Sequence, residues 1–265
     1  MAASMLKSTL RWSARLAFTG SLFVGLISSW QWLTSKSHTI QSTALQETRT
    51  YRIFNEHSNG PVIYSLDGHS LRNGLAPAVI FSFAAILRGQ ELPKVIAIYS
   101  NASRDRDFRP LGSAPTHWRP KIDGRSSDFD NFLFAELLPE IEGRKAAGVR
   151  RYLMGHSLSG LYALDLATRE PERFTGVFAF APTFSHDTSI GERLPKACHS
   201  RTFLYENWGL ESSRDTAVFS ATAARWKADP DCRRKSSLLT PRHYGSLHQT
   251  IMLTGQFHIA FWLLE

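Results

Sequence analysis

The stretch VRRYLMGHSLSGLYALDLA, residues 149–167, contains the pattern G-x-S-x-G between a strand-like and a helix-like segment. The residues before Gly155 form a short apolar run typical of a buried strand, and those after Gly160 are rich in leucine and alanine, which favours a helix. The two glycines allow strand and helix to approach closely, so that Ser157 lies on a sharp, strained turn. Its hydroxyl is then exposed beside a helix N-terminus, where backbone N–H groups stabilise negative charge. We therefore predict that Ser157 is a nucleophile.

The chain on both sides of this turn alternates between strand and helix patterns. Apolar and β-branched runs predict strands over residues 50–54, 61–66, 94–99, 149–154, 175–181 and 202–205. Apolar residues at helical spacing predict helices over residues 129–141, 158–168, 213–227 and 253–264. Such alternation is typical of the α/β class, in which helices cover both faces of a mostly parallel sheet. Together with the serine turn, it predicts an α/β-hydrolase fold.

A serine hydroxyl is a weak nucleophile until a base removes its proton, so a histidine should follow it in the chain. His243 and His248 both lie after Pro241 and before the last predicted helix, in a segment with loop composition. A histidine on such a loop has the freedom to reach the serine. His248 is nearer the helix, which favours it as the base, and His243 is the alternative.

The histidine needs a carboxylate that orients it, and in this fold the acid lies between serine and histidine in chain order. The segment after the predicted strand 202–205 offers Glu206, Glu211 and Asp215. Glu206 directly follows the strand, and Asp215 fits the first turn of the next helix, where negative charge is favoured. Glu211 follows the turn residue Gly209 and lies within the loop, so it is the preferred acid.

Two backbone N–H groups stabilise the oxyanion that forms during acyl transfer. In this fold one belongs to the residue after the nucleophile, here Leu158, and the other to a loop that follows an early strand. The loop after residues 61–66 begins with the pair Asp67-Gly68, which predicts His69 as the second donor.

Seven segments of the chain resemble the esterase D family of serine esterases and occur in the same order as in that family. They are LQETRTYRIF (45–54), PVIYSLDG (61–68), SRDRDFRP (103–110), FDNFLFAELLPEIE (129–142), MGHSLSGLYAL (154–164), FAFAPTF (178–184) and YGSLHQT (244–250). The family includes S-formylglutathione hydrolases, antigen 85 mycolyltransferases and siderophore esterases of the Fes and IroE type. The resemblance covers residues 45–264.

The resemblance implies roles for several residues. A carboxylate shortly after a glycine matches Glu211, and a histidine with Ser or Thr two places on matches His248 but not His243. The family's Arg-Asp stretch borders its site, which implies a substrate contact for Arg104. The segment after the predicted strand 175–181 implies another for Phe184.

Residues 1–35 differ from the rest of the chain. Lys7, Arg11 and Arg15 precede the stretch 16–33, in which no residue is charged. A basic end followed by about 18 mostly apolar residues is typical of a signal peptide or a membrane anchor. We therefore expect an exported protein, periplasmic or anchored to a membrane through this segment and facing outward. Residues 36–44 are then a linker, and residues 45–265 form a single catalytic domain.

The composition limits the classes of molecule that the protein is expected to bind. The chain has 265 residues and a formal net charge of +8, which favours an anionic substrate such as a catecholate siderophore ester. No run of Lys and Arg is interleaved with aromatic residues, so we expect a small-molecule ester and no nucleic acid as partner. Cys198 and Cys232 can pair in an oxidising compartment or remain free thiols. Because no spacing typical of zinc ligands occurs, we expect neither a metal ion nor a cofactor.

The predicted function is hydrolysis of carboxylic esters through an acyl-enzyme on Ser157. Two alternatives use the same fold. One is an acyltransferase, in which the same serine passes the acyl group to an acceptor other than water. The other is a catalytically silent binding protein that kept the fold and lost the activity.

Overall fold

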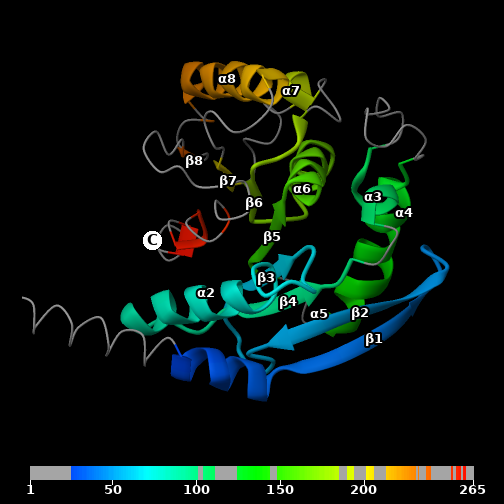
Figure 1. The fold of residues 1–265 in the computed structure, drawn as a ribbon, viewed down its shortest axis with the longest axis vertical. Helices are drawn as coiled ribbons and strands as arrows, with labels where there is room; N and C mark the ends of the chain where they lie inside the picture. The colour runs from blue at the N-terminus through cyan, green and yellow to red at the C-terminus, as the bar shows by residue number, and fades with distance from the viewer. Residues whose placement is uncertain are drawn as a thin grey trace, which may run out of the picture.

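The computed structural model describes residues 25–100, 104–110, 124–143, 148–184, 190–193, 201–205, 213–230, 232, 237–239, 252, 255–257 and 259–260. In these parts of the chain, the strands form one sheet in the order β1-β2-β4-β3-β5-β6-β7-β8 (Figure 1). Strands β3 to β8 run parallel, and β1 and β2 continue the sheet antiparallel at one edge. The strands are β1 (Lys36–Ser42), β2 (Glu47–Phe54), β3 (Val62–Ser65), β4 (Lys94–Ile98), β5 (Arg151–His156), β6 (Gly176–Phe180), β7 (Arg201–Tyr205) and β8 (Ser237–Leu239).

Helices follow the parallel strands and lie on both sides of the sheet. In Figure 1, α2 and the red C-terminal residues lie on one side of β5, and α6 lies on the other. A π-helix, η1 (Phe132–Leu137), connects α4 and α5. The helices are α2 (Leu75–Leu87), α3 (Arg104–Phe108), α4 (Ser126–Asn131), α5 (Leu138–Glu142), α6 (Leu158–Arg169), α7 (Ile190–Arg193) and α8 (Ser213–Ala228).

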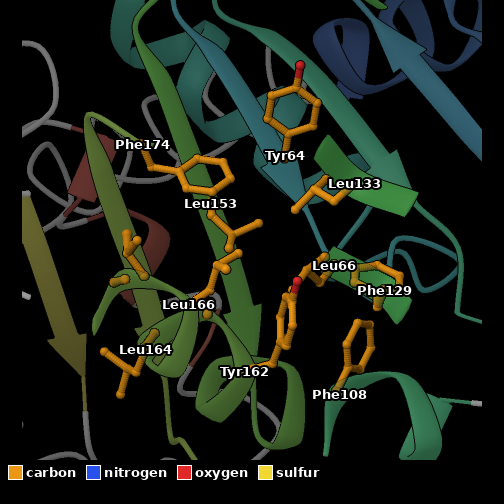
Figure 2. Close-up of a cluster of buried hydrophobic side chains, with 14 of the residues drawn as sticks. Tyr64, Leu66, Phe108, Phe129, Leu133, Leu153, Tyr162, Leu164, Leu166 and Phe174 are labelled. Atoms are coloured by element: carbon orange, nitrogen blue, oxygen red, sulfur yellow. The ribbon is translucent and has the colours of Figure 1, made fainter. Parts of the chain in front are cut away.

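Two hydrophobic clusters hold these helices to the sheet, because successive side chains of a strand point to opposite faces. In β5, Leu153 belongs to the cluster that includes residues of α4, η1 and α6, whereas Met154 belongs to the cluster that includes α2. Figure 2 shows the first cluster, in which the rings of Phe108, Phe129 and Tyr162 lie within 5.0–5.5 Å of one another. The central sheet is therefore buried on both faces, as the sequence predicts for the α/β class.

Residues 36–44 are not the linker expected from the sequence. Lys36–Ser42 form β1, which pairs with β2 from Lys36 opposite Ile53 to Ser42 opposite Glu47. Its sequence, KSHTIQS, is mostly polar because an edge strand is largely solvated, so the apolar alternation that marks a strand is weak.

Helix α2 is a second element that the sequence analysis missed. Its sequence, LAPAVIFSFAAIL, is apolar on all sides, and eight of its 13 residues are buried. A helix without a polar face shows no 3.6-residue periodicity, which is the signal that predicts amphipathic helices.

Residues 25–34 form a helix that packs against the domain. Ile27 and Gln31 on this helix are buried. The Gln31 amide donates hydrogen bonds to Asn55 Oδ1 and to Ser82 Oγ, each at 2.9 Å. The folded domain therefore includes residues that were expected to belong to a signal peptide or anchor. None of the helices in the described part of the chain has the length and hydropathy needed to cross a bilayer.

Cys232 is buried and disulfide-bonded, and no described cysteine has a free thiol. Cys198, the partner that the sequence offers, lies outside the described residues. Disulfides persist mainly in oxidising compartments.

The contacts of Gln31 predict that residues 25–35 stabilise the domain. A chain that begins at residue 25 should melt like the full chain, whereas one that begins at residue 36 should melt at a lower temperature. Loss of one buried isoleucine and two hydrogen bonds costs about 3 kcal/mol, which corresponds to a decrease in Tm of roughly 6–12 °C. Calorimetry measures both chains, and equal melting temperatures would contradict the prediction.

Candidate active site

Ser157 occupies the turn between β5 and α6, as the sequence predicts. Its backbone has φ 61° and ψ −120°, a conformation that residues with side chains seldom adopt. A Cβ added to Gly155 would lie 2.2 Å from the carbonyl oxygen of Ser159, and one added to Gly160 would lie 3.1 Å from that of Phe180. The glycines before and after the serine therefore provide the space in which strand and helix meet.

The side chain of Ser157 is half-buried and lies beside the end of β6. Its backbone N–H donates to the carbonyl of Phe180 at 2.9 Å. Its Oγ lies 3.1 Å from Thr183 Oγ1, and the N–H of Thr183 donates to the Ser157 carbonyl at 3.3 Å. Thr183 was not predicted from the sequence as a site residue. Its position just after a strand that neighbours the serine strand is the signal that could have identified it.

The loop after β3 passes close to the end of β4. Asp67 in this loop has φ 58°, and the N–H of Gly68 donates to the carbonyl of Ile98 at 2.7 Å. A Cβ added to Gly68 would lie 2.6–2.7 Å from atoms of Ala97. Only glycine allows an approach this close, so Gly68 fixes the course of the loop toward the next residue.

That next residue is His69, which we predict as the second oxyanion donor. Its side chain is exposed, and its Nδ1 lies 3.1 Å from Ser100 Oγ. Its ring meets the ring of Tyr99 edge-on, with 6.4 Å between centroids. These contacts turn the imidazole toward the residues after β4, and the role of the His69 N–H stays a prediction.

Asp67 is buried, and its carboxylate connects two elements of the site. Arg104 of α3 donates from Nε to Oδ1 at 2.7 Å and from Nη2 to Oδ2 at 2.8 Å, a paired geometry that gives strong hydrogen bonds. The hydroxyl of Ser159, in the first turn of α6, lies 2.8 Å from Oδ2. The carboxylate therefore links the loop after β3 both to α3 and to the helix that carries the serine turn.

The pKa of the Asp67 carboxyl results from opposing effects. Burial raises its pKa, whereas the hydrogen bonds and positive charge of Arg104, together with the hydroxyls of Ser100 and Ser159, lower it. The lowering effects are larger, and the pKa lies below its ordinary value. Asp67 is therefore ionised at neutral pH.

Helix α3 is held in place by a buried ion pair. Asp107 of α3 pairs with Arg49 of β2, and both side chains are fully buried. Glu47 and Arg106 lie next to this pair and extend it toward solvent. Because an unpaired buried charge is costly, the pair fixes α3 against the sheet and with it the position of Arg104.

Arg104 and Phe184, which are expected to contact the substrate, differ in their exposure. Arg104 lies at the site with part of its side chain exposed, so its contact with a substrate stays a prediction. Phe184 has no exposed surface and belongs to the hydrophobic cluster that also contains Leu158. The expected contact of Phe184 is therefore corrected, since burial in this cluster leaves its ring no surface to offer a substrate.

The candidate base and most candidate acids lie outside the described residues. These are His243, His248, Glu206 and Glu211. Asp215 lies in the first turn of α8, where the sequence analysis placed it as a helix-terminal charge. The roles of these residues as base and acid therefore stay predictions.

Two described residues that follow His248 pack into the domain. Met252 belongs to the same hydrophobic cluster as Phe180 and Ala181, at the end of β6. The Gln256 amide donates to the carbonyl of Arg72 at 3.1 Å, in the segment between β3 and α2. The described C-terminal residues thus bond the segment between β3 and α2 and belong to the cluster that includes the end of β6.

Two hollows of about 560 and 490 Å³ lie away from the serine turn. Both are lined by Glu56, His57, Ser58 and Asn59, in the segment that precedes β3. Within the described residues, no group of three or more His, Cys, Asp or Glu side chains is arranged to hold a metal ion.

A mostly parallel sheet covered on both faces, with a serine at positive φ between a strand and a helix, defines the α/β-hydrolase fold. The fold predicted from the sequence is thereby confirmed. The model of the family described as "Putative esterase" matches residues 42–249. The chain belongs to this esterase family, in agreement with the resemblance found in the sequence.

Several known proteins are similar to this chain. Ferri-bacillibactin esterase BesA of Bacillus subtilis (strain 168) is 30% identical in an alignment of 179 residues that covers 57% of this chain and 61% of BesA. The match thus spans less than two thirds of that relative. Among solved structures, an IroE-like serine hydrolase from Shewanella oneidensis has a TM-score of 0.71 at 21% identity, covering 87% of this chain and 80% of the other.

The enterobactin esterase FES from Shigella flexneri, solved in the presence of 2,3-di-hydroxy-N-benzoyl-serine, is a further structural neighbour. It has a TM-score of 0.62 at 18% identity, covering 87% of this chain and 58% of FES. At these identities, both solved structures show similarity of fold.

Proposed function

We propose that the chain hydrolyses carboxylic esters through an acyl-enzyme on Ser157. The observation that carries the proposal is the position of this serine, on a strained turn between β5 and α6 in a chain of the esterase family. Ser157 Oγ attacks the ester carbonyl, and the N–H groups of Leu158 and His69 stabilise the oxyanion. The alcohol leaves, and water then releases the acyl group from the serine.

His248 is proposed as the base, oriented by Glu211. The hydrophobic cluster that Met252 shares with Phe180 supports this role, because Phe180 accepts the backbone hydrogen bond of Ser157. His248 precedes Met252 by four residues, a segment that spans at most about 14 Å. This separation is short enough for the proposed role.

Ser157→Ala should abolish ester hydrolysis, because no other group then forms the acyl-enzyme. With p-nitrophenyl acetate, kcat should decrease by at least about 1,000-fold. Ser37→Ala, in the exposed part of β1, is the matched control and should keep wild-type kcat. A fluorophosphonate probe should label the wild type and the control but not Ser157→Ala. Equal turnover by Ser157→Ala and wild type would contradict the proposal, and an unlabelled wild type would favour a silent binding protein.

We further propose that the substrate is a siderophore-type ester with catecholate groups. BesA is a ferri-bacillibactin esterase, and FES was solved with a 2,3-di-hydroxy-N-benzoyl-serine. The net charge of +8 supports an anionic substrate, since a positive protein attracts it at long range.

A pair of matched substrates tests the substrate class. A cyclic serine trilactone with 2,3-dihydroxybenzoyl groups should be hydrolysed with a kcat/KM at least about tenfold higher than the same trilactone with unsubstituted benzoyl groups. The preference should decrease with added salt, which screens the charge. Liquid chromatography of the released acyl-serine measures both rates, and equal rates at low salt would contradict the catecholate assignment.

For localisation, we propose that the protein is exported and rests on the outer face of a membrane through residues before 35. Leu26, Trp30 and Leu33 share one face of the helix 25–34 and are 62%, 42% and 81% exposed. This helix packs on the domain through Ile27 and Gln31, so its exposed apolar face can contact a membrane surface without crossing it. The proposed contact is therefore interfacial, and the disulfide at Cys232 supports export.

Replacement of Leu26, Trp30 and Leu33 by serine should weaken binding of the full chain to phosphatidylglycerol vesicles. Each substitution removes an apolar side chain that would be buried in the membrane interface. The affinity for the vesicles should therefore be at least about tenfold weaker. Leu71→Ser, on another exposed leucine, is the control and should bind like the wild type. Vesicle co-sedimentation measures binding, and equal sedimentation of the triple variant and wild type would contradict the proposal.

A further inference from the structure

We infer that Ser159 is a positioning residue, which acts through Asp67 to set the two oxyanion donors against each other. The inference rests on the proposed function, because it concerns the N–H groups of Leu158 and His69. Ser159 directly follows the first of these donors, and Asp67 lies two residues before the second. The contact between Ser159 and Asp67 therefore joins the two backbone segments that carry the donor N–H groups.

Each of these two segments contains a strained residue. Ser157 has φ 61° and Asp67 has φ 58°, although both carry side chains. Conformations of this kind persist only where surrounding contacts leave no alternative, and they are common at functional sites. The direction of each donor N–H depends on this backbone, so a contact that holds both turns also controls both donors.

The hydroxyl of Ser159 provides that contact from a fully buried position. It accepts the backbone N–H of His156 at 3.0 Å, and it lies 2.8 Å from Asp67 Oδ2 and 2.9 Å from the His156 carbonyl. A hydroxyl has one proton, and a carboxylate is a stronger acceptor than a carbonyl. The proton is therefore directed to Asp67, and a single oxygen connects the last residue of β5 with the loop after β3.

Arg104 makes this contact rigid. Its two hydrogen bonds fill one side of the Asp67 carboxylate and supply the positive charge that a buried carboxylate needs. Arg104 is itself fixed by α3, which the pair of Asp107 and Arg49 holds against β2. The loop with Asp67 is thus held from two directions, by α3 and by the first turn of α6.

A positioning role predicts an effect on kcat rather than on KM. The oxyanion forms only as the serine attacks, so misdirected N–H groups weaken the transition state more than the bound ester. A misplacement of about 1 Å reduces catalysis by on the order of 100-fold. A residue that only stabilised the fold would instead lower Tm and leave the kcat of the folded fraction unchanged.

Ser159→Ala in the full-length protein is the primary test. With p-nitrophenyl acetate, kcat should decrease about 10- to 100-fold and KM should change less than about threefold. The inhibition constant of a trifluoromethyl ketone, which forms a tetrahedral oxyanion on the serine, should increase in proportion to the loss of kcat. Thr168→Ala is the matched control, because the Thr168 hydroxyl is also buried in α6 but donates to the carbonyl of Asp165, within the same helix. It should keep wild-type kcat.

A double-mutant cycle with Asp67→Asn tests the coupling. If Ser159 acts through Asp67, the double variant should lose no more kcat than the more impaired single variant. Multiplied losses would mean that the residues act separately and would overturn the inference. Arg104→Lys keeps the charge but not the paired hydrogen bonds, and it replaces Ser159→Ala if that variant fails to fold. With p-nitrophenyl acetate it should show the same decrease in kcat, and wild-type kcat would overturn the inference.

The outcomes separate this inference from the proposed function. If the wild type turns over the ester and Ser157→Ala does not, the proposed function holds, and an unchanged kcat in Ser159→Ala then overturns the positioning role alone. If the wild type neither turns over esters nor reacts with the fluorophosphonate, both fail together.

Discussion

The positive φ of Ser157 is the constraint on which the rest of the site depends. A residue with a side chain adopts such a backbone at a cost of about 1–3 kcal/mol, so neighbouring contacts must exclude the relaxed alternatives. Gly155 and Gly160 leave the space for the turn, and the carbonyl of Phe180 binds its N–H. The strained turn matters for the chemistry, because it exposes the hydroxyl at the edge of the sheet.

Parallel strands bring the other parts of the site to the same edge. Asp67 follows β3, Ser157 follows β5, and Thr183 follows β6, although 116 residues separate the first from the last in sequence numbering. These three strands are neighbours in the sheet and end side by side. The order of strands therefore determines which loops meet, and the loops need only supply the side chains.

Charge then fixes the loops with respect to each other. A buried carboxylate needs a positive partner and further hydrogen bonds, and both conditions restrict geometry more than hydrophobic contacts do. Asp107 meets them through Arg49, and Asp67 through Arg104 and Ser159. The two pairs are connected by α3, so contacts link β2, the strand next to the edge strand β1, to the serine turn.

The sequence predicted the parts of the fold whose signal is local. The turn at Ser157 and the apolar strands β3 to β6 are encoded in short contiguous patterns. β1 was missed because an edge strand is polar, and α2 because a buried helix has no polar face. The helix 25–34 was assigned to a signal or anchor, since hydropathy alone does not show that Gln31 would find partners at Asn55 and Ser82.

The contact of Ser159 could have been predicted in part from the sequence. The residues after the nucleophile begin a helix that must pack against a buried strand, so a serine there is bound to be buried as well. A buried hydroxyl requires a hydrogen-bonding partner. Asp67 lies in a loop at the same sheet edge, two residues before the predicted oxyanion donor. The pairing of Ser159 with Asp67 thus follows from topology and hydrogen-bond satisfaction, but only when the strand order β3-β5 is known. Sequence gives the residues of this contact, and the sheet brings them together.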